Sequence, residues 1–439
     1  MVSVRTVSLP GSAGPPLLGH SAQVLRDPLR FYLDRYRRFG PVSRFNLVGH
    51  PSALAVGGDA AKVVLEGRDR CFASGAGWAL WAGPFFPRSL VMLDFEEHLA
   101  HRALMEQVLT RDRIDGYLEQ LHAVLAEDLA TWPTSSNFRA QDAVRATVLR
   151  ASVRVFMGGG LGAESGEIER AFLDCAAAAG ATLRFEYPGS TWSRGLAGRR
   201  RLEELFVDRT PAVRARGGSD LFAVLSRATG LDGRGLSDED VVNHMIFLLY
   251  ASFDPVSIPL VTMIRYLAEY PEWQTQCRHE SYALGNGRPG MAELDRLGSL
   301  DLVMRESLRL MPPVYALPNL AVRDTDVLGF EIPAGTVTVV APLVNHRLPE
   351  YWPNPEVFDP ERFAPHRRED RAHEYAWIPF GGGVHRCLGL HYGAVQMKAV
   401  MHQLLLRHRW RLARGHVPEV IWRGFARMRD GLPIELTRL

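Results

Sequence analysis

Cysteine is scarce in this chain of 439 residues, and so are the long apolar runs that a membrane requires. The four cysteines, Cys71, Cys175, Cys277 and Cys387, are widely separated and form no CxxC pair. No stretch approaches the roughly 18 consecutive apolar residues of a membrane-spanning helix, and no apolar segment typical of a secretory signal is present. The sequence therefore predicts a soluble protein of the reducing cytoplasm without a membrane anchor.

A large excess of charge is also missing. The 51 lysines and arginines nearly balance the 49 aspartates and glutamates, and the net charge of +2 is too small to indicate a nucleic-acid-binding protein. The run Arg199-Arg200-Arg201 is isolated and is typical of a solvated helix face. No linker, low-complexity run or repeat divides the chain, and 46% of its residues are apolar. We therefore expect one large domain over residues 1–439, or two tightly packed lobes.

The hydrophobic pattern indicates a mainly α protein with a small β region. A helix is predicted over residues 28–39, and helical periodicity continues from residue 96 to about 225. Alternation over residues 42–56 and short apolar runs with turns over residues 318–340 predict strands. Residues 71–87 have an unusual composition and are predicted as a loop.

One long helix stands out near the middle of the chain. Ser237 and the acidic residues after it are typical of a helix start, and the apolar run that follows continues to Pro271, which gives about 30 residues. Pro255 and Pro259 lie inside this helix. Because proline has no N–H, each leaves the carbonyl four residues earlier without its helical partner, and we expect a kink there.

A glycine-rich segment at residues 380–389, FGGGVHRCLG, presents a single cysteine where the last long helix begins. Backbone N–H groups and Arg386 would stabilise a Cys387 thiolate, which is what an iron ligand requires. Gly389 would let the helix approach a flat macrocycle closely. Three other interpretations stay open: a buried structural cysteine, a phosphate-binding loop that lacks the usual Lys-Ser/Thr, and a zinc site formed by His385, Cys387 and His391.

This segment resembles the haem-binding signature of the cytochromes P-450, FxxGx(H/R)xCxG. Two further segments agree in order and distance: Glu306-Ser307-Leu308-Arg309 is similar to the ExxR motif of that family, and residues 358–363, FDPERF, are similar to its PERF segment. An ExxR pair alone is an ordinary helix surface pattern, so only the three motifs together indicate the family. The resemblance extends over almost the whole chain and implies the triangular, mainly α (α+β) fold of this family.

The resemblance implies a role for each motif residue. Cys387 would be the proximal ligand of haem b, with Phe380 beside the thiolate and Gly381, Gly383 and Gly389 shaping the loop. The residues that would form a buried network holding this loop are Glu306, Arg309 and Arg362. The residues that would bind the haem propionates are His98, Arg102 and His385. Asn319 stands where the family often has a cation, and Arg323 is the candidate to replace it.

The chain departs from the family in the long helix. Where the family usually has Ala/Gly-Gly-x-Asp/Glu-Thr, this chain has Ala251-Ser252-Phe253-Asp254-Pro255, so the acid is kept and the alcohol is lost. We expect Asp254 and the carbonyls freed by the prolines, including that of Ala251, to hold a water or a polar group of the substrate in place of the alcohol. The alternative is that the prolines only kink the helix for packing.

Aromatic residues are predicted to make a dry substrate pocket, with about half of the candidates serving as core instead. Four of them precede the His98 helix, and the others occupy positions that the resemblance places near the substrate. The candidates are Trp78, Trp81, Phe85, Phe86, Tyr250, Phe253, Val314, Tyr315 and Leu317.

The function that follows is oxidation of a small, largely apolar or aromatic molecule, plausibly a biosynthetic intermediate, by a monomeric haem-thiolate monooxygenase or oxidase. Electrons would come from a separate ferredoxin and ferredoxin reductase, because the chain has neither a GxGxxG fingerprint nor a four-cysteine cluster. The alternatives are a peroxide-driven peroxygenase, a catalyst of radical coupling or ring closure, and, from another class, a haem-binding scaffold without turnover.

Overall fold

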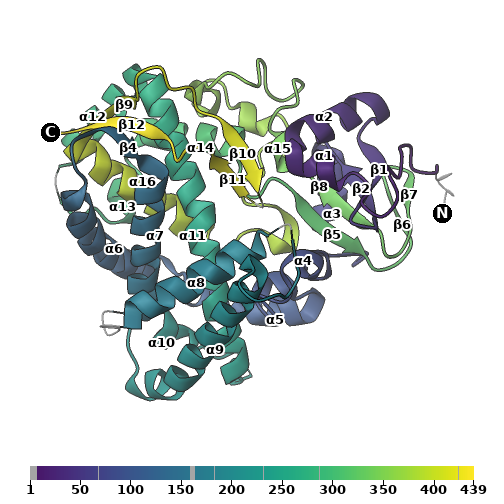
Figure 1. The fold of residues 1–439 in the computed structure, drawn as a ribbon, viewed down its shortest axis with the longest axis horizontal. Helices are drawn as coiled ribbons and strands as arrows, with labels where there is room; N and C mark the ends of the chain where they lie inside the picture. The colour runs from purple at the N-terminus through teal and green to yellow at the C-terminus, as the bar shows by residue number, and fades with distance from the viewer. Residues whose placement is uncertain are drawn as a thin grey trace. The chain divides into compact units, whose positions relative to one another are not determined.

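The computed structural model describes residues 7–67, 69–158, 164–181, 183–230, 232–285, 287–423 and 425–439. Helices dominate, and the strands are few and short (Figure 1), which confirms the predicted mainly α class with a small β region. Contacts between α-carbons divide the chain into two compact units, so a single domain over residues 1–439 stays a prediction. The first unit comprises Met1–Gly83, Val91–Leu99 and Leu308–Cys387, and the second comprises Pro84–Leu90, Ala100–Ser307 and Leu388–Leu439.

The first unit contains a five-stranded sheet with the order β1-β2-β8-β5-β3. β1 and β2, the strands that the alternation in residues 42–56 predicts, pair antiparallel, and β2 pairs parallel with β8. Ala53 belongs to one apolar cluster and Leu54 to another, so both faces of the sheet are buried. The strands are β1 (Val42–Leu47), β2 (His50–Ala55), β3 (Phe72–Ala73), β5 (Leu317–Ala321) and β8 (Val337–Val340).

Helices pack on both faces of this sheet, because Tyr32 of α2 lies in one apolar cluster and Val64 of α3 in the other. α2 has the predicted bounds and begins at a side-chain cap, in which Asp27 accepts a hydrogen bond from the Arg30 N–H. The remaining elements of the unit are α1 (Ser21–Arg26), α2 (Pro28–Phe39), α3 (Gly58–Glu66), α4 (Ser74–Ala82), the start of α5 (Phe95–Glu106), the hairpin β6 (Thr325–Val327) and β7 (Phe330–Ile332), and α15 (Pro342–Asn345).

The prediction of a loop over residues 71–87 is wrong, because β3 and α4 lie within it. α4 begins at Ser74, and in its first turn the N–H groups of Gly75 and Ala76 both donate to the carboxylate of Asp94 at 2.9 Å. A Cβ on Gly77 would lie 2.6 Å from the Pro318 carbonyl oxygen, so the glycine permits close packing against β5. A partner from outside the segment and tertiary packing override the low helix propensity of its glycines.

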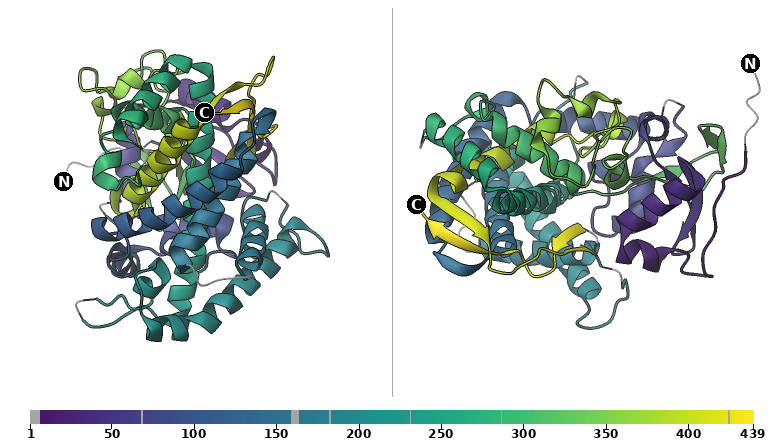
Figure 2. Two further views of the ribbon diagram at one scale, coloured as in Figure 1. Left: turned by 90° about the vertical axis from the view of Figure 1, so that its left-hand side faces the viewer. Right: turned by 90° about the horizontal axis from the view of Figure 1, so that it is seen from above.

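The second unit is a helical assembly in which α11 (Asp238–Glu269) runs among α7, α9 and α16 (Figure 2). The predicted start is confirmed, since the Asp240 N–H donates to Ser237 Oγ at 3.0 Å, and the helix continues through Pro255 and Pro259. α11 alone among the described helices is long and apolar enough to cross a membrane, but 72% of its most apolar window is buried. The other helices are α6 (Arg111–Thr131), α7 (Ala140–Met157), α8 (Ser165–Ala179), α9 (Thr191–Arg216), α10 (Leu221–Leu225), α12 (Pro271–Leu284), α13 (Met291–Leu294), α14 (Gly298–Leu310) and α16 (Leu390–Arg407).

Two features of the second unit correct the sequence analysis. The helical stretch predicted for residues 96–225 is interrupted by β4 (Ser135–Arg139), whose partner β12 (Pro433–Arg438) is remote in sequence and also pairs with β9 (His408–Leu412). Arg199 is buried and donates to Asn243, so it does not lie on a solvated helix face. The remaining strands form the hairpin β10 (Val420–Arg423) and β11 (Phe425–Met428).

Candidate functional site

The cysteine segment forms a constrained loop in the first unit, just before α16 begins at Leu390. Gly381 and Gly383 have φ angles of +69° and +61°, and a Cβ on Gly383 would lie 1.9 Å from the Leu65 carbonyl oxygen, so a side chain is excluded there. The Cys387 N–H donates to the Phe380 carbonyl at 2.9 Å and closes the loop. Cys387 is exposed, whereas the other three cysteines are buried. The structural-cysteine interpretation therefore fails for Cys387.

Two of the predicted propionate ligands lie together in the first unit. The rings of His98 in α5 and His385 in the cysteine loop are stacked, with their centroids 3.9 Å apart. His385 Nε2 also lies 3.6 Å from a carboxylate oxygen of Asp94, the residue that caps α4. Arg102 follows His98 by one helical turn and pairs with Glu106 at 3.0 Å. The structure therefore brings His98 and His385 together, and Asp94 connects His385 to the start of α4.

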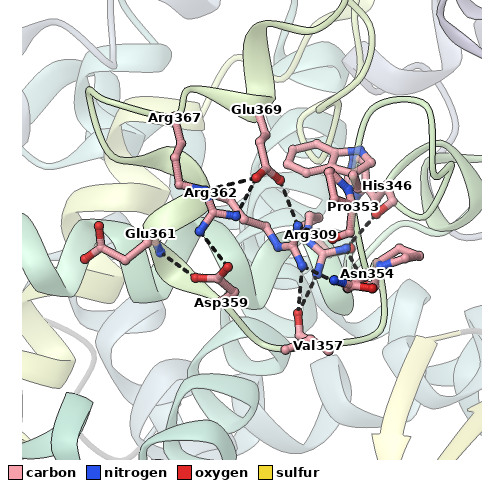
Figure 3. Close-up of polar contacts among 12 residues, drawn as sticks. Arg309, His346, Pro353, Asn354, Val357, Asp359, Glu361, Arg362, Arg367 and Glu369 are labelled. Carbon is pink, nitrogen blue, oxygen red and sulfur yellow. Dashed lines mark hydrogen bonds and ion pairs between the residues drawn. The ribbon is translucent and has the colours of Figure 1, made fainter.

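Two fully buried arginines organise the segment before the cysteine loop (Figure 3). Arg309 donates to the carbonyls of His346, Pro355 and Val357 at 2.8, 2.7 and 3.2 Å. Arg362 donates to the carbonyls of Pro353 and Asn354 and pairs with Glu369 at 2.8 Å.

Glu306 is also fully buried, one turn before Arg309 in α14. Glu369 and the carbonyl partners could not be predicted from the sequence, because PERF and ExxR give the arginines but not the groups that they bind. The two arginines therefore hold the polypeptide over residues 346–369, which precedes the cysteine loop. That Glu306, Arg309 and Arg362 form one network that holds the loop itself stays a prediction.

α11 is buried along most of its length but has a partly exposed stripe. Phe247, Ala251 and Pro255 recur every four residues, and Leu248 lies three residues before Ala251, which places them on one face of the helix. Two residues of the departure from the family pattern, Ala251 and Pro255, therefore lie on an accessible face. The carbonyl of Ala251 has no helical N–H donor, since residue 255 is proline.

Asp254 does not share that stripe. It is 1% exposed, accepts a hydrogen bond from Arg145 Nη1 of α7, and lies 3.7 Å from Arg427 Nη2 of β11. We call Asp254, Arg145 and Arg427 the Asp254 cluster. The Asp254 carboxylate is directed to these arginines. The expectation that Asp254 and the Ala251 carbonyl hold one water together stays a prediction. Nothing local in the sequence pointed to Arg145 or Arg427.

The aromatic candidates divide between core and accessible positions. Phe85, Phe86 and Phe253 are buried, and Phe253 packs against Phe172 with ring centroids 5.3 Å apart. Tyr250 is partly exposed and packs against Phe86 and Phe425, with centroids 4.4 and 5.8 Å apart. The other partly exposed candidates, all in the first unit, are Trp78, Trp81, Val314, Tyr315 and Leu317, of which Trp81, Tyr315 and Leu317 pack on its apolar clusters.

Two polar residues near β5 have partners within the first unit. Asn319 donates to the Leu317 carbonyl at 3.2 Å, and Arg323 Nε lies 3.2 Å from Cys71 Sγ. Arg323 also donates to the Asp69 carbonyl. Its contacts therefore hold the segment around Cys71.

The residues present fit a haem group. Cys387 offers an exposed thiol, His98 and His385 offer imidazoles, and a Cβ added at Gly389 or Gly393 would meet no described atom within 4 Å, which leaves the start of α16 open to a flat ligand. The zinc interpretation lacks a ligand set, because the described residues contain no group of three or more His, Cys, Asp or Glu side chains suited to a metal ion.

Comparisons with known proteins agree with this site. The family model of cytochrome P450 matches residues 201–435. The chain is 40% identical over 432 residues to putative cytochrome P450 136 of Mycobacterium tuberculosis, covering 97% of this chain and 88% of that protein. It is 28% identical over 452 residues to abscisic acid 8'-hydroxylase 3 of Oryza sativa, covering 98% and 86%.

A solved structure is similar over its whole length. Retinoic acid bound cyanobacterial CYP120A1 superimposes with a TM-score of 0.90 at 24% identity, covering 99% of this chain and 100% of that one. This likeness confirms the fold. Together with the family model and the 40% identical relative, it means that this chain belongs to the cytochrome P450 family, the monooxygenases that carry haem b.

Proposed function

We propose that Cys387 binds the haem iron through its thiolate and that the chain oxidises a small, largely apolar molecule. The observation that carries this proposal is the exposed cysteine in a loop that glycine conformations constrain, preceded by a segment that two buried arginines hold in place. A thiolate-bound haem supplies the activation of oxygen needed to oxidise C–H bonds. His98, Arg102 and His385 bind the propionates in this proposal, and Arg309 and Arg362 keep the loop in position.

The chemistry of the substrate is supported by two of the similar proteins. One is named for abscisic acid and the other was solved with retinoic acid, and both compounds are largely apolar. The partly exposed Tyr250, Ala251 and Pro255 of α11 offer a surface of matching character. We therefore propose an apolar substrate for this chain as well.

The reducing partner in this proposal is a separate ferredoxin with its reductase, and the protein acts as a monomer in the cytoplasm. No flavin-binding fingerprint or iron–sulfur cysteine cluster occurs in the chain, which supports an external electron donor. Reconstitution with a ferredoxin and its reductase, followed by NADPH consumption, tests this point.

A peroxide-driven reaction is the second candidate, and the burial of Asp254 favours it. The Asp254 carboxylate is engaged by two arginines, and Pro255 has no hydroxyl, so neither residue is arranged to pass a proton to an oxidant. Peroxide already carries the protons that a dioxygen reaction must import. Turnover with added peroxide compared with turnover through the ferredoxin system distinguishes the two routes.

The ligand assignment is tested by spectroscopy. Reduced protein with carbon monoxide should show the red-shifted Soret band of thiolate ligation, and Cys387→Ala and Cys387→His should both lose it. Cys277→Ala, which changes a buried cysteine, should retain the band. An unchanged spectrum in either Cys387 variant would refute the assignment.

A further inference from the structure

Two arginines of the second unit share one buried carboxylate. Asp254 is 1% exposed and is hydrogen-bonded to Arg145, whereas Arg427 Nη2 lies 3.7 Å from the carboxylate, beyond hydrogen-bond distance. The Nε of Arg427 is buried and has no hydrogen-bond partner among the residues that the structure describes. Arg427 therefore retains donor capacity that Asp254 does not use.

The Asp254 cluster has more positive than negative charge. Burial lowers the pKa of Arg145 to about 10, and the adjacent charge of Arg427 adds to this effect. Asp142, the other carboxylate that acts on Arg145, is exposed, so water screens its charge. A second anion placed beside Arg427 would balance the cluster, and a guanidinium binds a carboxylate with two parallel hydrogen bonds.

The surroundings of Arg427 are apolar and partly accessible. Its side chain is 35% exposed, and Phe425, two residues earlier on β11, points to the same face of the strand. Phe425 packs against Tyr250 of α11, which packs against Phe86. A ligand in contact with this surface meets aromatic rings along its body and a guanidinium at one end.

We propose that Arg427 binds the carboxylate of the substrate, and that the substrate class is the largely apolar carboxylic acids. This inference rests on the proposed function, because it assigns the surface of Tyr250 and Phe425 to the molecule that the haem oxidises. Arg427 is then a specificity-determining residue, whereas Arg145 keeps Asp254 occupied.

The experiment compares acids with their uncharged esters. Retinoic acid, abscisic acid and palmitic acid, each with its methyl ester, are titrated into the haem-loaded protein by isothermal titration calorimetry. At least one acid should bind more tightly than its ester. Arg427→Ala should weaken binding of that acid by about tenfold to a hundredfold and leave the ester unchanged, as expected for loss of one charge-assisted contact.

The control variant is Arg429→Ala, two residues further on. Arg429 is 58% exposed and pairs with Glu419 at 2.7 Å, so its loss should change neither affinity. Arg427→Gln, with haem content and melting temperature measured alongside, separates loss of the ion pair from misfolding. The proposal is overturned if no acid binds better than its ester, or if Arg427→Ala weakens acid and ester equally. Failure of the haem assignment would appear separately, as an altered carbon monoxide spectrum, because calorimetry does not depend on the iron.

Discussion

The carboxylate of Asp254 compensates the partly buried charge of Arg145, so its removal affects folding as well as chemistry. We predict that Asp254→Ala lowers the free energy of unfolding by about 3 kcal/mol, because it leaves a partly buried guanidinium without its partner. Urea unfolding followed by circular dichroism measures this change. Asp34→Ala, which removes an exposed carboxylate 3.7 Å from two arginines, should change stability by less than about 1 kcal/mol.

An equal, small effect in both variants would mean that the Asp254 cluster is hydrated and weakly coupled. The expected large effect has a consequence for kinetics. Turnover in the Asp254→Ala variant would fall both because the second unit is less stable and because proton delivery changes. Activity must therefore be normalised to the amount of folded, haem-loaded protein.

The sequence predicted the residues whose chemistry is concentrated in short motifs. The sequence singles out Cys387 and its glycines, His98 and the arginines of ExxR and PERF, because each motif requires particular residue types at fixed spacing. Arg145 and Arg427 were not found, since each meets Asp254 only after folding and each belongs to a segment without a distinctive pattern. The orientation of the Asp254 side chain could not be predicted either. Its position in the helix indicates which face it lies on, but not which residues of other elements it contacts there.

Among the elements, α11 was predictable because its start, its apolar length and its end are all local signals. The Ser237 cap and Pro271 mark the two ends, and the helix has the expected length. α4 was not predictable, since the Asp94 carboxylate at its start and the close packing at Gly77 come from other segments. β4 was missed for the same reason, because β12 supplies its hydrogen-bond partners.

Substitution of Pro255 tests whether the interrupted hydrogen bonding of α11 contributes to the reaction. Proline inside a helix costs about 3 kcal/mol relative to alanine, and threonine costs well under 1 kcal/mol. Pro255→Thr restores an N–H to the Ala251 carbonyl, so we predict a gain of about 1–2 kcal/mol in unfolding free energy, measured by urea unfolding. If the free carbonyl holds a water used in turnover, the same variant should release more peroxide per NADPH consumed.

Pro259→Thr is the matched control, because it restores the equivalent hydrogen bond one turn further along α11. It should show a similar stability change without the increase in peroxide release. A Pro255→Thr variant that is no more stable and couples as well as the parent would mean that the proline serves only packing.

At the scale of the whole molecule, several buried histidines are neutral in the folded protein. Burial lowers the pKa of His346 to about 3, and it lowers the pKa of His402 and His408 to about 4. His346 Nε2 accepts from the Ile378 N–H at 2.8 Å, and its Nδ1 lies 3.2 Å from the Arg309 carbonyl, so the neutral ring satisfies both partners. A second proton would break the contact to Ile378, in the segment that leads to the cysteine loop.

These pKa values give the sign of the pH dependence. The unfolded chain binds protons on these histidines at about pH 6.5, and the folded protein does not, so stability is complete above that pH and is lost as the pH falls toward 4. Each histidine contributes a slope of up to about 1.4 kcal/mol per pH unit in this range. We predict that the unfolding free energy, measured by urea denaturation at pH 7.5 to 5, decreases below pH 6.5.

The His346→Gln variant, whose amide supplies both a donor and an acceptor, should reduce the slope of unfolding free energy against pH by about the contribution of one histidine. The His50→Gln variant, at an exposed position, should have the same slope as the parent protein. Identical slopes in all three proteins would show that His346 becomes protonated in the folded state, and that the Ile378 contact does not depend on a neutral ring.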